Sequence, residues 1–111
     1  MAYQFFHDDN GDPRAATSRD RRRLGRFLET DMQGSVARCA EVLDLLDDIA
    51  VGRRKRWQMT GNAYTLILSK RRARIHAEFG RAADLILPTS ELRQVLLECQ
   101  TFLERSPRRS R

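Results

Sequence analysis

Positively charged side chains dominate one segment of the chain, from residue 53 to residue 74. The segment contains eight lysine and arginine residues and no aspartate or glutamate. Such a segment creates a positive potential, which attracts phosphates or carboxylates and speeds the encounter with acidic partners. The sequence therefore predicts a partner-binding surface made by Arg53, Arg54, Lys55, Arg56, Lys70, Arg71, Arg72, Arg74 and His76.

Metal and phosphate chemistry have little support in the sequence. The run His7-Asp8-Asp9 contains metal-ligating residue types, but neighbours along a strand point to opposite faces. His76 is the only other histidine of the chain. Neither Gly11 nor Gly61 lies in a glycine-rich motif that could cradle a phosphate. We therefore expect no metal and no cofactor.

The two cysteines, Cys39 and Cys99, fall on the apolar stripes of predicted helices. A catalytic cysteine needs an exposed thiolate with a base nearby, whereas these positions are typical of small buried hydrophobic residues in a reducing compartment. A disulfide between them requires that the two helices be neighbours. We expect buried thiols, no catalytic residues and no enzymatic activity.

Length and composition indicate one folded domain. The 111 residues, of which 41% are hydrophobic, can bury a single core, which we expect to span residues 1–106, with 107–111 as a flexible basic tail. The net charge of +6 favours nucleic acid, an anionic membrane surface or an acidic protein as partner. The sequence shows neither a secretory signal nor an apolar run of ~20 residues, so we expect a cytoplasmic protein without a membrane span.

A β-hairpin is predicted at the N-terminus. Residues 3–7 form an aromatic-rich strand, and the pair Asn10-Gly11 tolerates the positive φ of a tight turn. The return strand runs from about Arg14 to Ser18, and the basic run Arg19 to Arg26 follows it. The secondary structure of residues 14–29 stays open at this point.

A long helix is predicted to begin at Thr30. Thr30 and Gln33 form a capping-box pattern, Asp31 lies favourably in the first turn, and Gly52 supplies a C-terminal cap. The outer side carries several carboxylates, which we interpret as a solvated acidic face. The apolar stripe recurs at steps of three and four and consists of Met32, Val36, Cys39, Leu43, Leu46 and Ala50.

A second hairpin is predicted after this helix. Apolar and polar residues alternate over residues 64–68 and 73–79, and Ser69 to Arg72 make the turn. One face of this hairpin should cover the helices, and the other should carry Arg74 and His76 into solvent.

The last predicted helix begins near Pro88. Thr89 or Ser90 is expected as its cap, and Glu91 lies near the positive helix end. The pair Ser106-Pro107 should end the helix. The order is thus two hairpins, each followed by a helix (ββαββα), which predicts an α+β fold: an antiparallel sheet with the helices on one face. The other face of the sheet is left to solvent or to a partner.

The motif from Trp57 to Leu66 has two readings. Trp57 and Tyr64 could stack on nucleic acid bases, as aromatic residues do on single-strand-binding sheets. We favour an architectural role, in which both rings pack between the helix exit and the sheet while Gly61 allows a bend that a side chain would obstruct.

Three segments together resemble a known family. The N-terminal Met1-Ala2-Tyr3-Gln4-Phe5, the segment Leu24-Gly25-Arg26-Phe27-Leu28 and the central pattern Trp-Gln-x-x-Gly-x-x-Tyr-Thr-Leu at Trp57–Leu66 are similar to the YacL family of small bacterial proteins. The resemblance touches the chain from residue 1 to about residue 79. It implies a bacterial, cytoplasmic protein and brings no catalytic residues.

Two functions fit these observations. The first is a non-enzymatic binding module, a regulator or adaptor that docks on an acidic surface of the bacterial transcription or translation machinery. The alternative is a direct, largely non-specific nucleic-acid-binding protein that uses Arg53–Arg56, Lys70–Arg74 and the basic tail. Charge alone does not separate them.

Overall fold

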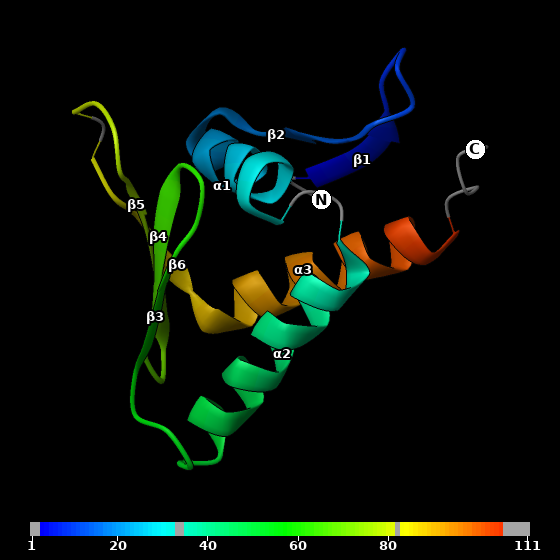
Figure 1. Ribbon diagram of the computed structural model, residues 1–111. Coiled ribbons are helices and arrows are strands. Elements are labelled where there is room, and N and C mark those ends of the chain that lie inside the picture. The colour runs from blue at the N-terminus through cyan, green and yellow to red at the C-terminus, as the bar shows by residue number, and fades with distance from the viewer. Residues whose placement is uncertain (1–2, 33–34, 82, 106–111) are drawn as a thin grey trace.

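The computed structural model describes residues 3–32, 35–81 and 83–105 of the chain. Two helices lie against one face of a sheet, and an N-terminal hairpin lies beyond them (Figure 1). In chain order the elements are β1 (Tyr3–His7), β2 (Pro13–Thr17), η1 (Arg19–Arg21), α1 (Arg22–Phe27), η2 (Leu28–Met32), α2 (Val36–Ala50), β3 (Trp57–Thr60), β4 (Tyr64–Leu68), β5 (Arg72–Ala77), β6 (Leu85–Pro88) and α3 (Thr89–Arg105).

The strands of the described residues form two separate antiparallel sheets. The first contains β1 and β2, and the second has the strand order β3-β4-β5-β6. The predicted α+β class and the order of hairpins and helices are confirmed, but the prediction of one sheet is wrong. Strands β3 and β6, which were not predicted, pair with the outer edges of the predicted second hairpin. The second sheet is thereby complete without the N-terminal hairpin.

The N-terminal hairpin forms where the sequence predicts it. Tyr3 pairs with Thr17 and His7 with Pro13. In the turn, Gly11 has φ 80°, a left-handed conformation that glycine adopts without a steric penalty. The Asp8 carboxylate accepts hydrogen bonds from two backbone N–H groups of the same turn, each at 2.9 Å. These local bonds fix the tight turn.

The basic run after this hairpin is helical. It passes through η1 and α1 into η2, a single turn of π-helix. Leu24, Phe27 and Leu28 from this stretch are almost fully buried. Residues 19–32 therefore contribute one wall of the core, and they separate the two sheets along the chain.

Helix α2 begins later than the capping-box pattern indicates. Its N-terminal cap is Ser35, whose side-chain oxygen accepts a hydrogen bond of 3.1 Å from the Arg38 N–H. The predicted cap Thr30 belongs to η2 and donates its hydroxyl to the Arg26 carbonyl at 2.8 Å. Gln33, the second member of the predicted capping box, lies outside the described residues.

The C-terminus of α2 is confirmed at Gly52. Gly52 has φ 84° and donates its N–H to the Ile49 carbonyl at 3.2 Å, while the Arg53 N–H donates to the Asp48 carbonyl at 2.9 Å. These two bonds make a Schellman motif, which satisfies the last carbonyls of the helix and turns the chain toward β3.

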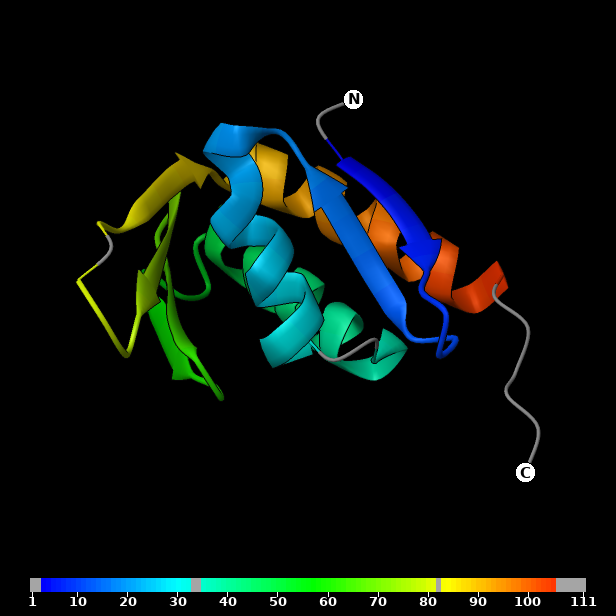
Figure 2. The same ribbon diagram turned by 90° about the horizontal axis from the view of Figure 1, so that it is seen from above.

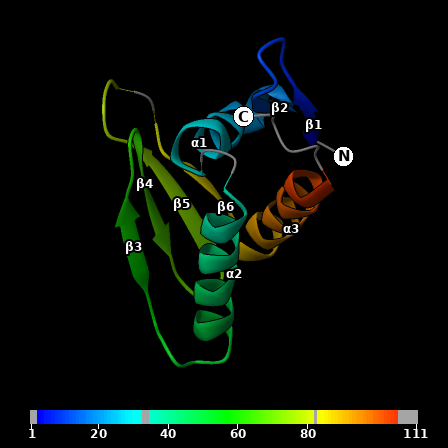
Figure 3. The ribbon, with the colours of Figure 1, turned by 45° about the vertical axis from the view of Figure 1, so that its right-hand side comes forward.

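The four-stranded sheet has an apolar inner face and a largely polar outer face. Helices α2 and α3 lie on the inner face, and no described helix covers the outer one (Figures 1 and 3). Strand β5 ends at Ala77, so the prediction that Phe79 belongs to the apolar face is wrong; its side chain is 77% exposed. The inner face is made by Leu66, Leu68, Ala73, Ile75 and Leu87, all almost fully buried.

Helix α3 starts at Thr89, and its first residue holds the β4–β5 turn. The Thr89 N–H donates to the Arg71 carbonyl at 3.1 Å, and its hydroxyl donates to the Lys70 carbonyl at 3.2 Å. The turn is further closed by the Ser69 N–H, which donates to the Arg72 carbonyl at 3.0 Å. The predicted stop at residues 106–107 and the predicted basic tail lie outside the described residues.

The two cysteines are core residues, as predicted. Cys39 on α2 and Cys99 on α3 are 0% and 7% exposed, and both thiols are free. The contact with the Cys39 sulfur, together with burial, raises the pKa of the Cys99 thiol above its ordinary value. Such a thiol is a poor nucleophile.

The N-terminal hairpin packs on two parts of the molecule: β2 lies against α1 and η2, and β1 runs along α3 (Figure 2). The Phe5 and His7 rings lie 5.7 and 4.9 Å from the Phe102 ring, measured between centroids. In the first turn of α3, Glu91 accepts two hydrogen bonds from Arg21, of 2.6 and 3.0 Å. The Tyr3 hydroxyl donates to the same carboxylate at 2.5 Å. Arg21 beside Glu91 holds the pKa of that carboxyl below its ordinary value.

Replacing Glu91 with glutamine should lower the free energy of unfolding at pH 7 by about 1 kcal/mol, since the ion pair is only partly exposed. A carboxyl whose pKa is depressed on folding stabilises the protein above its unfolded pKa and loses that effect as pH falls through the folded value. The difference between parent and variant should therefore begin to shrink as pH falls below about 4 and vanish once pH is below the folded pKa. Urea unfolding at pH 7 and pH 3 measures this free-energy difference at each pH. The matched variant Glu104→Gln, on the same helix and exposed, should change neither value; a difference as large at pH 3 as at pH 7 would contradict the ion-pair explanation.

Candidate functional site

The structure brings together only part of the predicted binding residues. Arg56, Arg72 and Arg74 line one hollow of about 280 Å³ on the outer sheet face, with Ile67, Ser69 and Ile86. We call these six residues the sheet hollow. The remaining predicted residues are exposed but do not line this hollow: Arg53, Arg54, Lys55, Lys70, Arg71 and His76.

Strand geometry explains the sheet hollow. Successive side chains of a strand point to opposite faces, so Arg72, Arg74 and His76 of β5 share the outer face while the residues between them are buried. The register places Arg74 between Ile67 of β4 and Ile86 of β6. The predicted exposure of Arg74 and His76 is confirmed, and two isoleucines complete the surface between the cations.

Charge is distributed unevenly over the outer face. Asp84 accepts a bond of 2.7 Å from the His76 ring and lies 3.7 Å from the Arg74 guanidinium. Glu78 accepts a hydrogen bond from the Thr65 hydroxyl. At the opposite end, neither Arg56 nor Arg72 forms an ion pair with any residue that the structure describes. The positive potential is therefore strongest at the end next to the β4–β5 turn.

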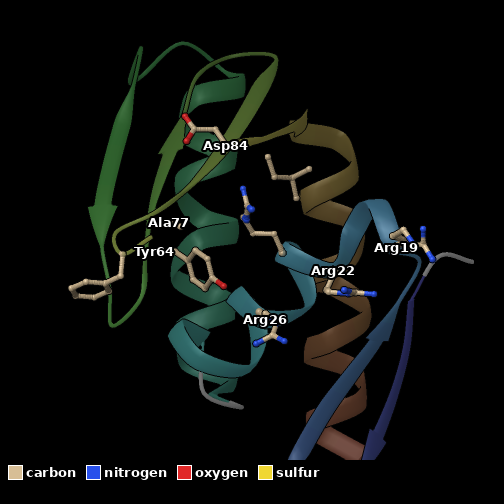
Figure 4. Close-up of a pocket in the computed structure, with 9 residues that line it drawn as sticks. Arg19, Arg22, Arg26, Tyr64, Ala77 and Asp84 are labelled. Atoms are coloured by element: carbon tan, nitrogen blue, oxygen red, sulfur yellow. The ribbon is translucent and has the colours of Figure 1, made fainter. Parts of the chain in front are cut away.

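A second basic surface lies between α1 and the sheet, where the sequence-based list of binding residues has no member. It is a cleft of about 480 Å³ (Figure 4). One wall consists of Arg19, Arg22, Arg23 and Arg26, and the other of Tyr64, Ala77, Phe79 and Leu85, with Asp84 at the rim. We call this the arginine cleft.

Within the part of the chain that the structure describes, none of the four cleft arginines forms an ion pair. Two nearby arginines do: Arg14 lies 3.7 Å from Glu29 and Arg21 lies 2.6 Å from Glu91. The cleft therefore concentrates uncompensated positive charge, which is the property expected of an anion-binding surface.

The sequence contained a signal for the arginine cleft. The four arginines stand at positions 19, 22, 23 and 26, which is the spacing of one helix face. Positions 24, 27, 28 and 31 have the same spacing and are all buried. The run thus has one basic and one buried face, but recognising this requires the assumption that residues 19–32 are helical.

The motif Trp57–Leu66 is architectural in the structure. Trp57 is half-buried against the core, and the Tyr64 ring meets the Phe27 ring edge-on at 6.3 Å. Gly61 lies against Asp31: a Cβ on Gly61 would be 2.5 Å from Asp31 Oδ2. Asp31 is 3% exposed and accepts hydrogen bonds from the backbone N–H groups of Ala63 and Tyr64, at 3.0 and 3.1 Å. The expected packing role and the expected close approach at Gly61 are both observed.

The described residues offer neither a metal site nor a membrane span. No group of three or more His, Cys, Asp or Glu side chains is arranged there to hold a metal ion. None of the helices in these residues has both the length and the apolar character needed to cross a bilayer.

Comparison with known proteins places the chain in a family. A family model described as "Uncharacterised protein family (UPF0231)" matches residues 1–95. A UPF0231 protein of Shewanella baltica (strain OS223) is 30% identical over 95% of this chain and 98% of its own length. Another, of Shewanella sp. (strain MR-4), is 33% identical over 69% of this chain and 63% of its own.

A more distant relative is the UPF0231 protein of Proteus mirabilis (strain HI4320), which is 29% identical over 69% of this chain and 62% of its own length. No solved structure matches the chain. The YacL proteins, which the three sequence segments resemble, belong to the same family as these relatives. On the match to residues 1–95 and the near full-length relative, the chain belongs to the UPF0231 family.

Proposed function

We propose that this chain is a small, non-enzymatic binding module of the bacterial cytoplasm, which docks on an acidic surface of a partner protein. The observation that supports the proposal best is the composition of the sheet hollow. An uncovered sheet face places Arg56, Arg72 and Arg74 next to two isoleucines, with Arg74 between them. This combination of apolar and basic side chains matches acidic protein surfaces, which offer both carboxylates and apolar contacts.

The chemistry of the hollow favours protein over nucleic acid at this face. Protein interfaces have an apolar core and a polar rim, and arginine is enriched in them. Ile86, on the edge strand β6, is 48% exposed. The described residues of the outer face include no phenylalanine, tyrosine or tryptophan on which a base could stack. The two isoleucines therefore have a better match in a protein than in a nucleic acid.

The unpaired arginines define how the partner would be recognised. Arginine can hold a carboxylate through two parallel hydrogen bonds, and it is more weakly hydrated than lysine. Because Arg56 and Arg72 have no carboxylate partner in the described structure, binding breaks no existing ion pair at these positions. Their charge should act mainly on the rate of association, which falls as salt increases.

A charge-reversal experiment tests the proposal. The immobilised full-length chain captures partners from a nuclease-treated bacterial extract, and each purified partner is then tested for association rate at low and high salt. Arg56→Glu together with Arg72→Glu should slow association with an acidic partner by about tenfold or more at low salt. The matched variant Arg22→Glu with Arg26→Glu makes the same change in net charge on the arginine cleft and should leave that rate nearly unchanged. Equal losses in both variants, or loss of every partner on nuclease treatment, would contradict the proposal.

A further inference from the structure

We infer that the arginine cleft is a second binding site, independent of the sheet hollow, and that its ligand is single-stranded nucleic acid. The two walls of the cleft have different chemistry: arginines on the side of α1, and aromatic and aliphatic side chains on the side of the sheet. A nucleotide unit has the same division, since its phosphate is anionic and its base is a flat apolar ring with polar edges.

The cationic wall is suited to phosphate. Arg19, Arg22 and Arg26 are exposed, and within the described residues they form no ion pair that a ligand would have to break. Guanidinium groups bind phosphate oxygens through two parallel hydrogen bonds. The nearest carboxylate at the rim, Asp84, already accepts a hydrogen bond from His76 and lies near Arg74 on the outer sheet face. Its repulsion of a phosphate in the cleft is therefore reduced.

The opposite wall is suited to a base. Phe79 is the most exposed large apolar side chain in the described part of the chain, at 77%. It lines the same cleft as the four arginines. The half-buried Tyr64 ring also lines this cleft, between the sheet and α1 (Figure 4). An exposed aromatic ring beside arginines is the arrangement with which proteins stack the bases of single strands. A duplex would not present an unstacked base to this ring.

The shape of the surface favours a strand over a free nucleotide. Arg22 and Arg26 also line a second hollow of about 350 Å³, on the β2 side of α1, together with Arg14 and Thr17. Glu29 in this hollow is neutralised by Arg14, at 3.7 Å, and accepts the Ala15 N–H. The two hollows thus share Arg22 and Arg26 and form a basic track across α1, along which successive phosphates can lie.

Fluorescence anisotropy with a labelled 12-nucleotide oligouridine, titrated with the full-length chain between 50 and 300 mM salt, tests the inference. If the four cleft arginines contact phosphates, log affinity should fall with log salt at a slope of about −3. Arg22→Gln with Arg26→Gln should bring the slope to about −1.5. Phe79→Ala should weaken binding roughly tenfold without changing the slope. The matched variant Arg56→Gln with Arg72→Gln removes the same charge from the sheet hollow and should retain the parental slope.

Four results would overturn the inference. These are the absence of saturable binding at 50 mM salt, an equal loss in the matched sheet variant, competition by free uridine monophosphate at the same concentration as the oligonucleotide, and tighter binding of a duplex of equal length. The replaced side chains are exposed, so thermal melting within a few degrees of the parent confirms that each variant is folded. The variant Arg56→Gln with Arg72→Gln also separates this inference from the proposed protein-binding function, because it should weaken protein binding at the sheet hollow and leave nucleic acid binding at the arginine cleft unchanged.

Discussion

Replacing Gly61 with valine should destabilise the protein by about 3 kcal/mol. A Cβ at this position would lie 2.5 Å from Asp31 Oδ2 and 2.9 Å from the carboxylate carbon. The carboxylate cannot move away freely, because two backbone N–H groups hold its two oxygens at 3.0 and 3.1 Å. The valine must therefore shift the β3–β4 loop or break these bonds, and both responses cost free energy. Urea unfolding of the variant measures the effect.

A double-mutant cycle tests the cause of this loss. Gly61→Ala should be clearly destabilising in the parent but much less so when Asp31 is also alanine, since the shorter side chain leaves room for the added methyl group. The sum of the two single-variant losses in unfolding free energy should then exceed the loss measured for the double variant. If Gly61→Val instead keeps the parental stability and abolishes partner binding, the motif around it is a binding site and the architectural interpretation is wrong.

Replacing Asp31 with alanine should cost about 3 kcal/mol as well. The carboxylate is buried and accepts from the Ala63 and Tyr64 N–H groups and from the Thr30 hydroxyl. Removing it leaves two backbone donors in the protein interior without their acceptor, and each such donor costs roughly 1–3 kcal/mol. Hydrogen exchange at these two amides should accelerate together with the loss of stability measured by urea unfolding.

The conservative variant Asp31→Asn separates hydrogen bonding from packing. It keeps the shape of the side chain and one acceptor oxygen, so its loss should be smaller than that of Asp31→Ala. Because Asp31 makes no ion pair with the described residues, the loss should also depend little on salt. An effect below about 1 kcal/mol for the alanine variant would show that water replaces the carboxylate.

The sequence correctly predicted the elements that are determined by residues close together in the chain. The Asn10-Gly11 turn, the alternation over β4 and β5 and the Gly52 cap all depend on neighbouring residues, and each forms where expected. The predicted helix start at Thr30 was wrong because a long-range contact overrides the local capping pattern. Asp31 is engaged by backbone groups more than thirty residues later in the chain, so η2 ends there and the helix begins again at Val36.

The binding surface was predicted in part for similar reasons. Alternation along β5 identified the exposed side of Arg74 and His76, but pairing with β6 brought Ile86 and Asp84 to that side. Strand β6 has four residues, too few for a periodic pattern. The arginine cleft joins α1 to residues about fifty positions away, and only the packing of α1 on the sheet reveals it.

The contacts between β1 and α3 must form late when the chain is synthesised. Tyr3 and Phe5 leave the ribosome first, but their partners Glu91 and Phe102 are made almost ninety or more residues later. A two-stranded hairpin is barely stable by itself in water. The hairpin can pack on α1 and η2 soon after it is made, but the contacts of its aromatic residues with α3 are among the last to form. Until then these residues remain open to chaperones and to other nascent chains.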